Sequence, residues 1–175
     1  MAKGESSERA KMENLRVYLV DDHPLMRMAL RRTLESYPRF IVIGESDNAE
    51  ECLTTVTTID VDMVAMDIQL PGLDGIEATR QLKAQHPGLK VVIVSAYGEE
   101  YLIPSIDTGA DGYMMKVQEP SAMIEGLLQA AEGTPLTDST LTRHLMDRAA
   151  AGPRDNSGPS LSDRGQEVLK HVSDS

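Results

Sequence analysis

The sequence has almost none of the residues that build disulfide frameworks or cysteine-based metal clusters. Cys52 is the only cysteine among 175 residues. A disulfide needs two cysteines and a cysteine-based metal cluster needs several, so both are excluded within one chain. There is no tryptophan, there is one phenylalanine, and aromatic residues make up 3% of the chain. The core must therefore be built from valine, isoleucine, leucine and the ten methionines.

Long apolar runs and basic clusters are also missing. The longest apolar stretches, such as residues 91–94, are far shorter than the ~20 residues that a membrane-spanning helix needs. No basic start followed by an apolar run marks a secretory signal. We therefore expect a cytoplasmic protein with no membrane partner. The net charge of −11 gives no sign of the basic surface that nucleic-acid binding usually requires.

Five short apolar runs alternate with five stretches of helical periodicity. The apolar runs are residues 17–20, 40–43, 63–66, 91–94 and 112–115, and the helical stretches are residues 24–36, 49–59, 75–85, 99–107 and 121–132. Short runs rich in β-branched residues, without polar alternation, are typical of strands buried on both faces. The sequence therefore predicts an α/β fold with a doubly wound parallel five-stranded sheet and helices on both of its faces.

The sequence changes character outside residues 15–133, which we interpret as one folded domain. Residues 1–14 are polar and lack an apolar period, so we expect a flexible leader. Residues 134–160 predict a helical and flexible linker, with one more helix at 139–151 followed by a segment rich in glycine and proline. Residues 161–175 begin an amphipathic helix and are too few to fold alone.

Polar side chains follow four of the predicted strands where each strand ends. They are Asp21 and Asp22, Asp67, Ser95 and Lys116. Functional groups of an open parallel sheet gather at the carboxyl ends of its strands, so we expect these side chains to lie together. Three carboxylates at one edge repel one another unless a cation joins them, and oxygen ligands suit Mg²⁺. With a hydroxyl and an ammonium beside them, they predict a phosphoryl-transfer site with a carboxylate nucleophile.

Four separate segments resemble the receiver domain of two-component response regulators. They are Val17-Tyr-Leu-Val-Asp-Asp-His-Pro24, Met66-Asp-Ile-Gln-Leu-Pro-Gly-Leu-Asp-Gly75, Ser95-Ala96 and Gly112-Tyr-Met-Met-Lys116. The Asp-Asp-His-Pro opening is similar to the NarL/FixJ branch in particular. The resemblance covers residues 15–133 and implies a flavodoxin-like (βα)5 fold. It also implies a phosphoprotein that catalyses only its own phosphorylation and dephosphorylation, and is not an enzyme acting on a separate substrate.

The resemblance assigns a role to each acidic residue of the predicted site. It implies that Asp67 is the phosphoacceptor. It further implies that Asp22, assisted by Asp21, holds Mg²⁺ together with Asp67 and the backbone carbonyl of Gln69.

The same resemblance assigns the switching residues. Ser95 is expected to bind a phosphoryl oxygen on activation, and Lys116 to pair with the acyl phosphate. Tyr113 stands where the family has an aromatic side chain that moves inward with Ser95. Gln69 and Tyr97 flank the approach of water to phosphorus, so they are expected to set the lifetime of the phosphoryl group.

The last residues of the sequence bear on what the receiver controls. Residues 161–169 are similar to the opening of a LuxR-type helix-turn-helix, although Gly165 stands where an acidic residue is usual. The resemblance implies a histidine kinase as partner, a homodimer on phosphorylation, and control of transcription in the intact regulator. Because no recognition helix follows here, DNA is expected as a partner only through a complete helix-turn-helix. The alternative is a stand-alone or truncated receiver that acts as a phosphate sink or protein-interaction module without DNA binding.

Two enzyme or cofactor-binding alternatives fit less well. An aspartyl-phosphate phosphatase expects a second aspartate two residues after the nucleophile, where this chain has Gln69. A nucleotide- or flavin-binding domain needs a phosphate loop rich in glycine or hydroxyl groups after the first strand, where this chain is acidic.

Three single residues lead to local expectations. His23 is interpreted as a capping or surface histidine, and Cys52 as a small packed residue. Pro104 lies inside the fourth helical stretch, where it removes an N–H donor and clashes with the preceding turn. We therefore expect this helix to begin late, with Pro104 in its first turn, or to be frayed.

Overall fold

The structure, a computed structural model, describes residues 13–96, 99–134, 146, 147 and 150. The chain divides into two units, Met1–Thr137 and Asp138–Ser175, and the sheet belongs to the first. Most of the predicted leader, linker and terminal helix lie outside the described residues, although Met146, Asp147 and Ala150 are helical. Among the described residues, every helix is too short or too polar to cross a bilayer.

Five parallel strands form one sheet in the order β2-β1-β3-β4-β5. The strands are β1 (Leu15–Val20), β2 (Phe40–Ser46), β3 (Met63–Met66), β4 (Lys90–Ser95) and β5 (Gly112–Met115). The helices are α2 (Pro24–Glu35), α3 (Ala49–Thr55), α4 (Gly75–Gln85), α5 (Leu102–Asp107) and α6 (Pro120–Glu132), with a 3₁₀ turn η1 (Glu99–Tyr101) before α5. The predicted doubly wound α/β fold is therefore confirmed.

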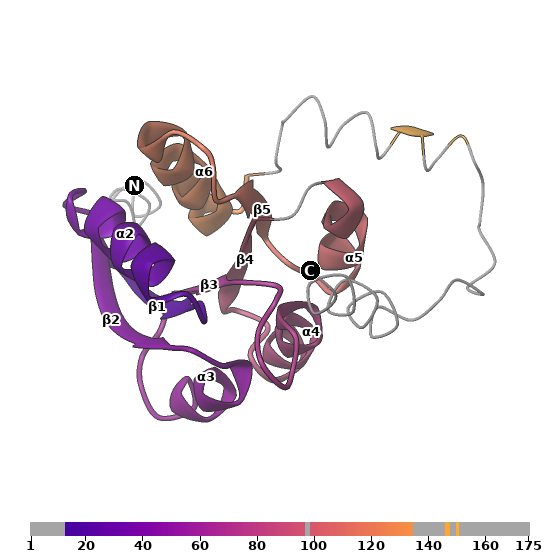
Figure 1. Cartoon of the computed structure of the whole chain (residues 1–175), viewed down its shortest axis with the longest axis horizontal. Coiled ribbons are helices and arrows are strands. Elements are labelled where there is room, and N and C mark those ends of the chain that lie inside the picture. Colours follow the sequence, from indigo (N-terminus) through magenta and orange to yellow (C-terminus); the bar gives the residue numbers. More distant parts are fainter. Residues whose placement is uncertain (1–12, 97–98, 135–145, 148–149, 151–175) are drawn as a thin grey trace, which may run out of the picture. The chain divides into compact units, whose positions relative to one another are not determined.

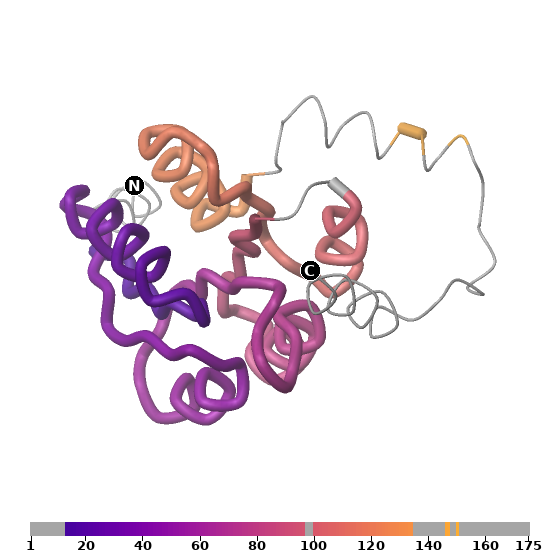
Figure 2. The backbone as a smooth tube through the Cα atoms, in the orientation of Figure 1, coloured from indigo at the N-terminus to yellow at the C-terminus, as the bar shows by residue number. Residues whose placement is uncertain are grey.

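The helices cover both faces of the sheet, as Figure 1 shows. Helices α2 and α6 pack on one face, and α3, α4 and α5 pack on the other. The path of the backbone in Figure 2 shows α2, α3, α4 and α5 each returning the chain to the start of the next strand. Strand order changes direction between β1 and β3, and the carboxyl ends of strands at such a point are where ligands of this architecture bind.

The three inner strands are buried on both faces, as their unbroken apolar runs predict. Residues 17–20 of β1, all of β3 and residues 91–95 of β4 are buried. For the two outer strands the prediction is wrong, since β5 alternates between buried and half-buried residues and Ile41 of β2 is 43% exposed. An outer strand has a neighbour on one side only, so the helices cover it less completely.

Helix α3 is shorter than its sequence period predicts. The predicted helix 49–59 ends at Thr55, where a run of threonines interrupts it. The Oγ1 atoms of Thr54, Thr57 and Thr58 donate to main-chain carbonyls three or four residues earlier. Such hydrogen bonds give the backbone an alternative to continuing the helix, and β-branched side chains favour helices weakly.

Helix α5 begins late, as Pro104 predicts. The 3₁₀ turn occupies Glu99–Tyr101 and the α-helix starts at Leu102, so that Pro104 is its third residue. The first four N–H groups of a helix have no partner within the helix, so the missing donor of a proline is tolerated there.

We expect replacement of Pro104 by alanine to change the free energy of unfolding by less than about 1 kcal/mol. A proline in a helix interior costs about 3 kcal/mol, but Pro104 lies in the first turn. Urea denaturation of Pro104→Ala measures this. The control is Pro120→Ala, at the start of α6, and a stabilisation near 3 kcal/mol by Pro104→Ala alone would contradict the first-turn position.

Candidate functional site

The main chain aligns the charged residues at the carboxyl edge of the sheet. Asp21, Asp67 and Lys116 are each the first residue after a strand. The N–H of Asp67 donates to the carbonyl of Val20 at 2.9 Å, and the N–H of Lys116 donates to that of Ser95 at 2.8 Å. Because these bonds continue the pairing of the strands by one step, the side chains start from fixed and neighbouring positions.

The ammonium of Lys116 lies between two carboxylates. Its Nζ is 2.7 Å from Oδ2 of Asp21 and 2.9 Å from Oδ2 of Asp67. The side chains of all three residues are at most 6% exposed. Burial lowers the pKa of Lys116, but the two carboxylates outweigh burial and leave this pKa above its ordinary value. The lysine is therefore a permanent cation at neutral pH.

Asp67 is a weaker acid than an ordinary aspartate. The pKa of Asp67 is raised from 3.8 to about 6: burial raises it most, Lys116 lowers it in part, and the charge of Asp21 raises it. At neutral pH the carboxylate is ionised, and it shares the ammonium of Lys116 with Asp21. A nucleophile that is ionised and poorly solvated is suited to attack an electrophilic phosphorus atom.

Asp22 and His23 lie beside Asp21 and Asp67 and complete a cluster of possible metal ligands. One ligand atom each from Asp21, Asp22, His23 and Asp67 lie within 4.8 Å of one another. Oδ1 of Asp22 is shielded from solvent and accepts no hydrogen bond within the described part of the chain, and it lies 3.0 Å from Nδ1 of His23. A buried oxygen without a donor, in an oxygen-rich site with excess negative charge, fits a hard divalent cation such as Mg²⁺.

His23 is a surface residue, as the sequence suggested, but it does not cap α2 through its side chain. The imidazole is 65% exposed, and it makes no capping hydrogen bond although His23 occupies the N-cap position. That its Nδ1 lies within reach of the carboxylates could not be predicted, since adjacency in sequence does not determine the direction of a side chain. Cys52 is buried, as expected, and burial raises the pKa of its thiol to about 12.

Ser95 and Tyr113, the two predicted switching residues, meet in the structure. Ser95 is fully buried, and its side chain shares a hydrogen bond with that of the half-buried Tyr113. Burial raises the pKa of Tyr113 to about 12, although the hydrogen bond from Ser95 opposes this. The phenol is therefore neutral and acts as a hydrogen-bonding partner. It lies on β5, paired in register with Ile93 of β4.

Of the two residues predicted to set the lifetime of the phosphoryl group, Gln69 lies among the described residues and Tyr97 does not. Gln69 is half-buried in the loop between Asp67 and α4. The role of its carbonyl as a metal ligand stays a prediction. Tyr97 lies outside the described residues, so its role also stays a prediction from the sequence.

Gly75 supports the site in a way that its place in the sequence pattern did not predict. It is the first residue of α4, and its N–H donates to the carbonyl of Ile68 at 2.8 Å. A Cβ atom at this position would lie 1.8 Å from the backbone oxygen of Asp67. Asp74 caps the same helix, its Oδ1 accepting the N–H groups of Ile76 and Glu77. The start of α4 is therefore packed directly against the main chain of Asp67, and an Asp-Gly pair before a helical stretch is the signal that could have found it.

Comparisons with known proteins give one family. The profile of the response regulator receiver domain matches residues 17–128. The nitrate/nitrite response regulator protein NarL of Escherichia coli K12 is 28% identical over 166 residues, covering 93% of this chain and 77% of NarL. The response regulator GacA of Pseudomonas aeruginosa is 32% identical over 153 residues, covering 86% of this chain and 71% of GacA. A solved two-component response regulator of the LuxR family from Aurantimonas is 27% identical with a TM-score of 0.70, covering 77% of this chain and 99% of that one.

We expect Gly75→Ala to lower the free energy of unfolding by about 1–3 kcal/mol, because the added methyl group overpacks a tight contact and forces the backbone to move. Urea denaturation measures the loss. Gly88→Ala is the matched control, since a Cβ at Gly88 would meet nothing within 4 Å. Equal free energies of unfolding for the two variants would contradict the close approach at Gly75.

The raised pKa of Asp67 predicts how the free energy of unfolding changes with pH. In the folded chain Asp67 keeps its proton up to about pH 6. In the unfolded chain the same carboxyl has its ordinary pKa of 3.8 and loses the proton at lower pH. The contribution of Asp67 to the free energy of unfolding therefore falls as the pH rises through this window, by an amount on the order of 3 kcal/mol. We expect Asp67→Asn to be stabilising at pH 7.5, and less so at pH 4.5.

Urea denaturation of wild type and Asp67→Asn at both pH values, without divalent cations, measures this difference. Groups that titrate in both proteins cancel in the comparison. A difference in the free energy of unfolding that is the same at pH 7.5 and pH 4.5 would show that burial does not raise the pKa of Asp67.

Proposed function

Because the chain belongs to the response regulator receiver family, we propose that Asp67 accepts a phosphoryl group from a histidine kinase, and that Mg²⁺ takes part in the transfer. Members of this family are the phosphorylation switches of two-component systems, and the relatives named above are response regulators. The choice of Asp67, and of the residues around it, is our proposal for this chain.

One observation carries this proposal: a single buried ammonium is shared by two buried carboxylates. Lys116 contacts Asp21 and Asp67 at 2.7 and 2.9 Å, and Asp22 lies beside them with a buried oxygen that lacks a donor. One positive charge against three carboxylates leaves an excess of negative charge. Such an excess is costly in a buried site unless a cation or a proton offsets it.

In the proposed reaction the carboxylate of Asp67 attacks phosphorus. The new bond joins a carboxylate oxygen to phosphorus, and the bond from phosphorus to the donor breaks, releasing a histidine nitrogen of the kinase or the acetate of acetyl phosphate. Asp21, Asp22, Asp67 and the carbonyl of Gln69 would hold Mg²⁺, which supplies positive charge opposite the phosphoryl oxygens. Lys116 then pairs with the acyl phosphate, and the Ser95 hydroxyl donates to one of its oxygens.

The hydrogen bond between Ser95 and Tyr113 is proposed to transmit phosphorylation to the surface of the domain. If the Ser95 hydroxyl turns to the phosphoryl group, it leaves Tyr113, whose ring then repacks. We propose that this change alters the face formed by α5, β5 and α6, and that the altered face favours a homodimer. The switch turns over no separate substrate: it catalyses only its own phosphorylation and dephosphorylation, in the cytoplasm. Gln69 and Tyr97 are proposed to limit the access of water and so to set its lifetime.

The kinase is proposed to contact the exposed apolar side chains beside the site, on α2 and directly after Lys116. Leu25 is 75% exposed, and Met26 and Met28 on the same helix are 37% and 44% exposed, although methionines were expected to build the core. Val117, directly after Lys116, is 84% exposed. Between α2 and the start of α6 lies a pocket of about 200 Å³ whose lining includes Met26, Asp21 and Lys116. These apolar side chains beside Asp21 and Lys116 are the surface that the kinase is proposed to bind while it delivers the phosphoryl group to Asp67.

The domain boundaries belong to the same proposal. We propose a receiver at residues 15–133, a linker at 134–160 and the start of a LuxR-type helix-turn-helix at 161–175. The chain spans 77% of the length of NarL. Control of transcription is proposed for the regulator only when it carries a complete helix-turn-helix.

Incubation with Mg²⁺ and acetyl phosphate, followed by intact mass measurement, tests the proposal. We expect the wild type to gain the mass of one phosphoryl group, because a small phosphodonor needs no kinase surface. Asp67→Asn is expected to gain none, and neither is the wild type without Mg²⁺. A phosphoryl group gained by Asp67→Asn would show that another residue is the acceptor.

A further inference from the structure

The turn that joins β1 to α2 carries two of the proposed metal ligands, Asp21 and Asp22. Three contacts fix Asp21 in this turn. Its N–H donates to the carbonyl of Ser46 at 3.1 Å, its Oδ1 accepts the N–H of His23 at 2.8 Å, and its Oδ2 faces Lys116. Asp22 has less support: its buried Oδ1 accepts no hydrogen bond among the described residues, and the side chain that lies near it is the exposed His23, whose Nδ1 is 3.0 Å away.

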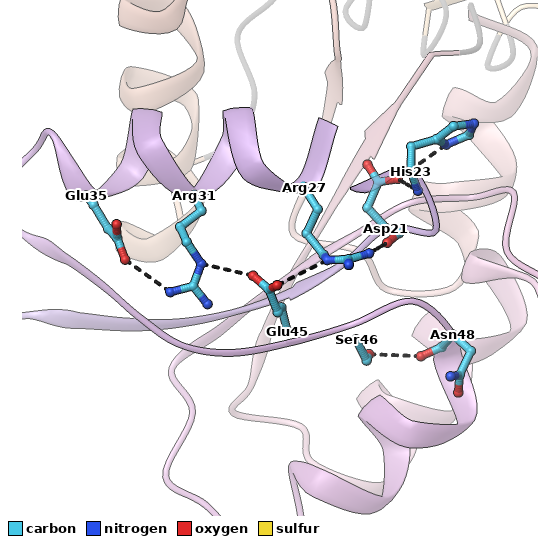
Figure 3. Close-up of polar contacts among 8 residues, drawn as sticks. All are labelled: Asp21, His23, Arg27, Arg31, Glu35, Glu45, Ser46 and Asn48. Atoms are coloured by element: carbon cyan, nitrogen blue, oxygen red, sulfur yellow. Dashed lines mark hydrogen bonds and ion pairs between the residues drawn. The ribbon is translucent and has the colours of Figure 1, made fainter. Parts of the chain in front are cut away.

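Arg27, one turn into α2, reaches back to this turn (Figure 3). Its Nη1 donates to the backbone carbonyl of Asp21 at 2.6 Å, and its Nε donates to Oε1 of Glu45 at 3.3 Å. The side chain of Arg27 is 19% exposed. A planar guanidinium that donates in two directions fixes both acceptors relative to one another, which a single-point donor does less well.

Glu45 on β2 is a charged anchor for this arginine. Its Oε2 accepts from Nε of Arg31 at 2.9 Å, and Arg31 in turn donates to Glu35 at 3.2 Å. Burial raises the pKa of Glu45, but Arg31 and Arg27 outweigh burial and hold this pKa below its ordinary value. The row of side chains therefore runs from the surface of α2 to the carbonyl of Asp21, as Figure 3 shows.

We propose that Arg27 is a positioning residue for the metal site, acting through the peptide bond between Asp21 and Asp22. The carbonyl of Asp21 and the N–H of Asp22 belong to one planar unit. A guanidinium that holds this carbonyl therefore also sets the direction in which the carboxylate of Asp22 leaves the main chain. The inference rests on the proposed function, because it concerns the Mg²⁺ that the site is proposed to hold.

Charge and positioning predict opposite effects when Arg27 is removed. A cation beside an acidic site opposes the binding of another cation, so the loss of its charge alone would tighten Mg²⁺ binding. The loss of the hydrogen bond to Asp21 frees the peptide and would weaken Mg²⁺ binding. Arg31 offers a matched comparison, because it is on the same helix, carries the same charge and contacts the same Glu45, while its hydrogen bonds go to Glu45 and Glu35.

The experiment is calorimetric titration of Mg²⁺ into the full chain, for wild type, Arg27→Met and Arg31→Met. We expect Arg27→Met to bind Mg²⁺ about tenfold more weakly, as is typical when the support of a metal ligand is lost. Arg31→Met is expected to bind Mg²⁺ as the wild type does, or more tightly. Urea denaturation without Mg²⁺ accompanies each titration, since a purely structural role lowers the free energy of unfolding and leaves the Mg²⁺ dissociation constant unchanged.

Two results would overturn the inference: Mg²⁺ binding by Arg27→Met at or above wild-type affinity, or equal weakening in Arg31→Met. If Arg27→Met does not fold, Arg27→Lys keeps the charge with a single-point donor. Weakened Mg²⁺ binding by Arg27→Lys supports the inference, and unchanged binding overturns it. A wild type that binds no Mg²⁺ would overturn the proposed function as well, whereas a wild type that binds Mg²⁺ beside an unaffected Arg27→Met overturns this inference alone.

Discussion

The ammonium of Lys116 is the constraint on which the rest of the site depends. Asp21 and Asp67 are two buried carboxylates on neighbouring strands, and without a cation between them their repulsion and loss of hydration would oppose folding. Lys116 follows β5, which is separated from β3 by β4, so its side chain must cross the end of β4 to reach both. One ion cluster thereby ties together three strands that do not all touch.

The main chain beneath the acidic residues has support of its own. The backbone oxygen of Asp67 lies against Gly75, where only a residue without a side chain fits. The backbone oxygen of Asp21 accepts from Arg27. The two carboxylates that face Lys116 are thus positioned by contacts to their main chain as well as by their own oxygens, one of which, Oδ1 of Asp21, accepts the N–H of His23. Such backing restricts side-chain freedom before any ligand arrives, which is the usual basis of tight and selective sites.

How far the sequence predicts this structure depends on the range of the interaction concerned. The order of strands and helices follows from local periodicity, and the residue after each strand end follows from it, which is why Asp21, Asp67 and Lys116 were expected to lie together. The early end of α3 depends on competing side-chain hydrogen bonds of threonines, and the exposure of Ile41 on its position at the edge of the sheet. The contact of Arg27 with Asp21, and the approach of Gly75 to Asp67, depend on how helices seat against strands. Periodicity carries no information about such distances.

The spread of the acidic cluster along the chain has a consequence for protein synthesis. Asp21 and Asp67 leave the ribosome well before Lys116, which follows the last strand. A nascent chain that ends before β5 therefore holds the acidic half of the cluster without its counter-ion, and the edge of β4 that β5 will pair with is open. The charged cluster is therefore complete only once β5 has joined the sheet and brought Lys116 beside Asp21 and Asp67.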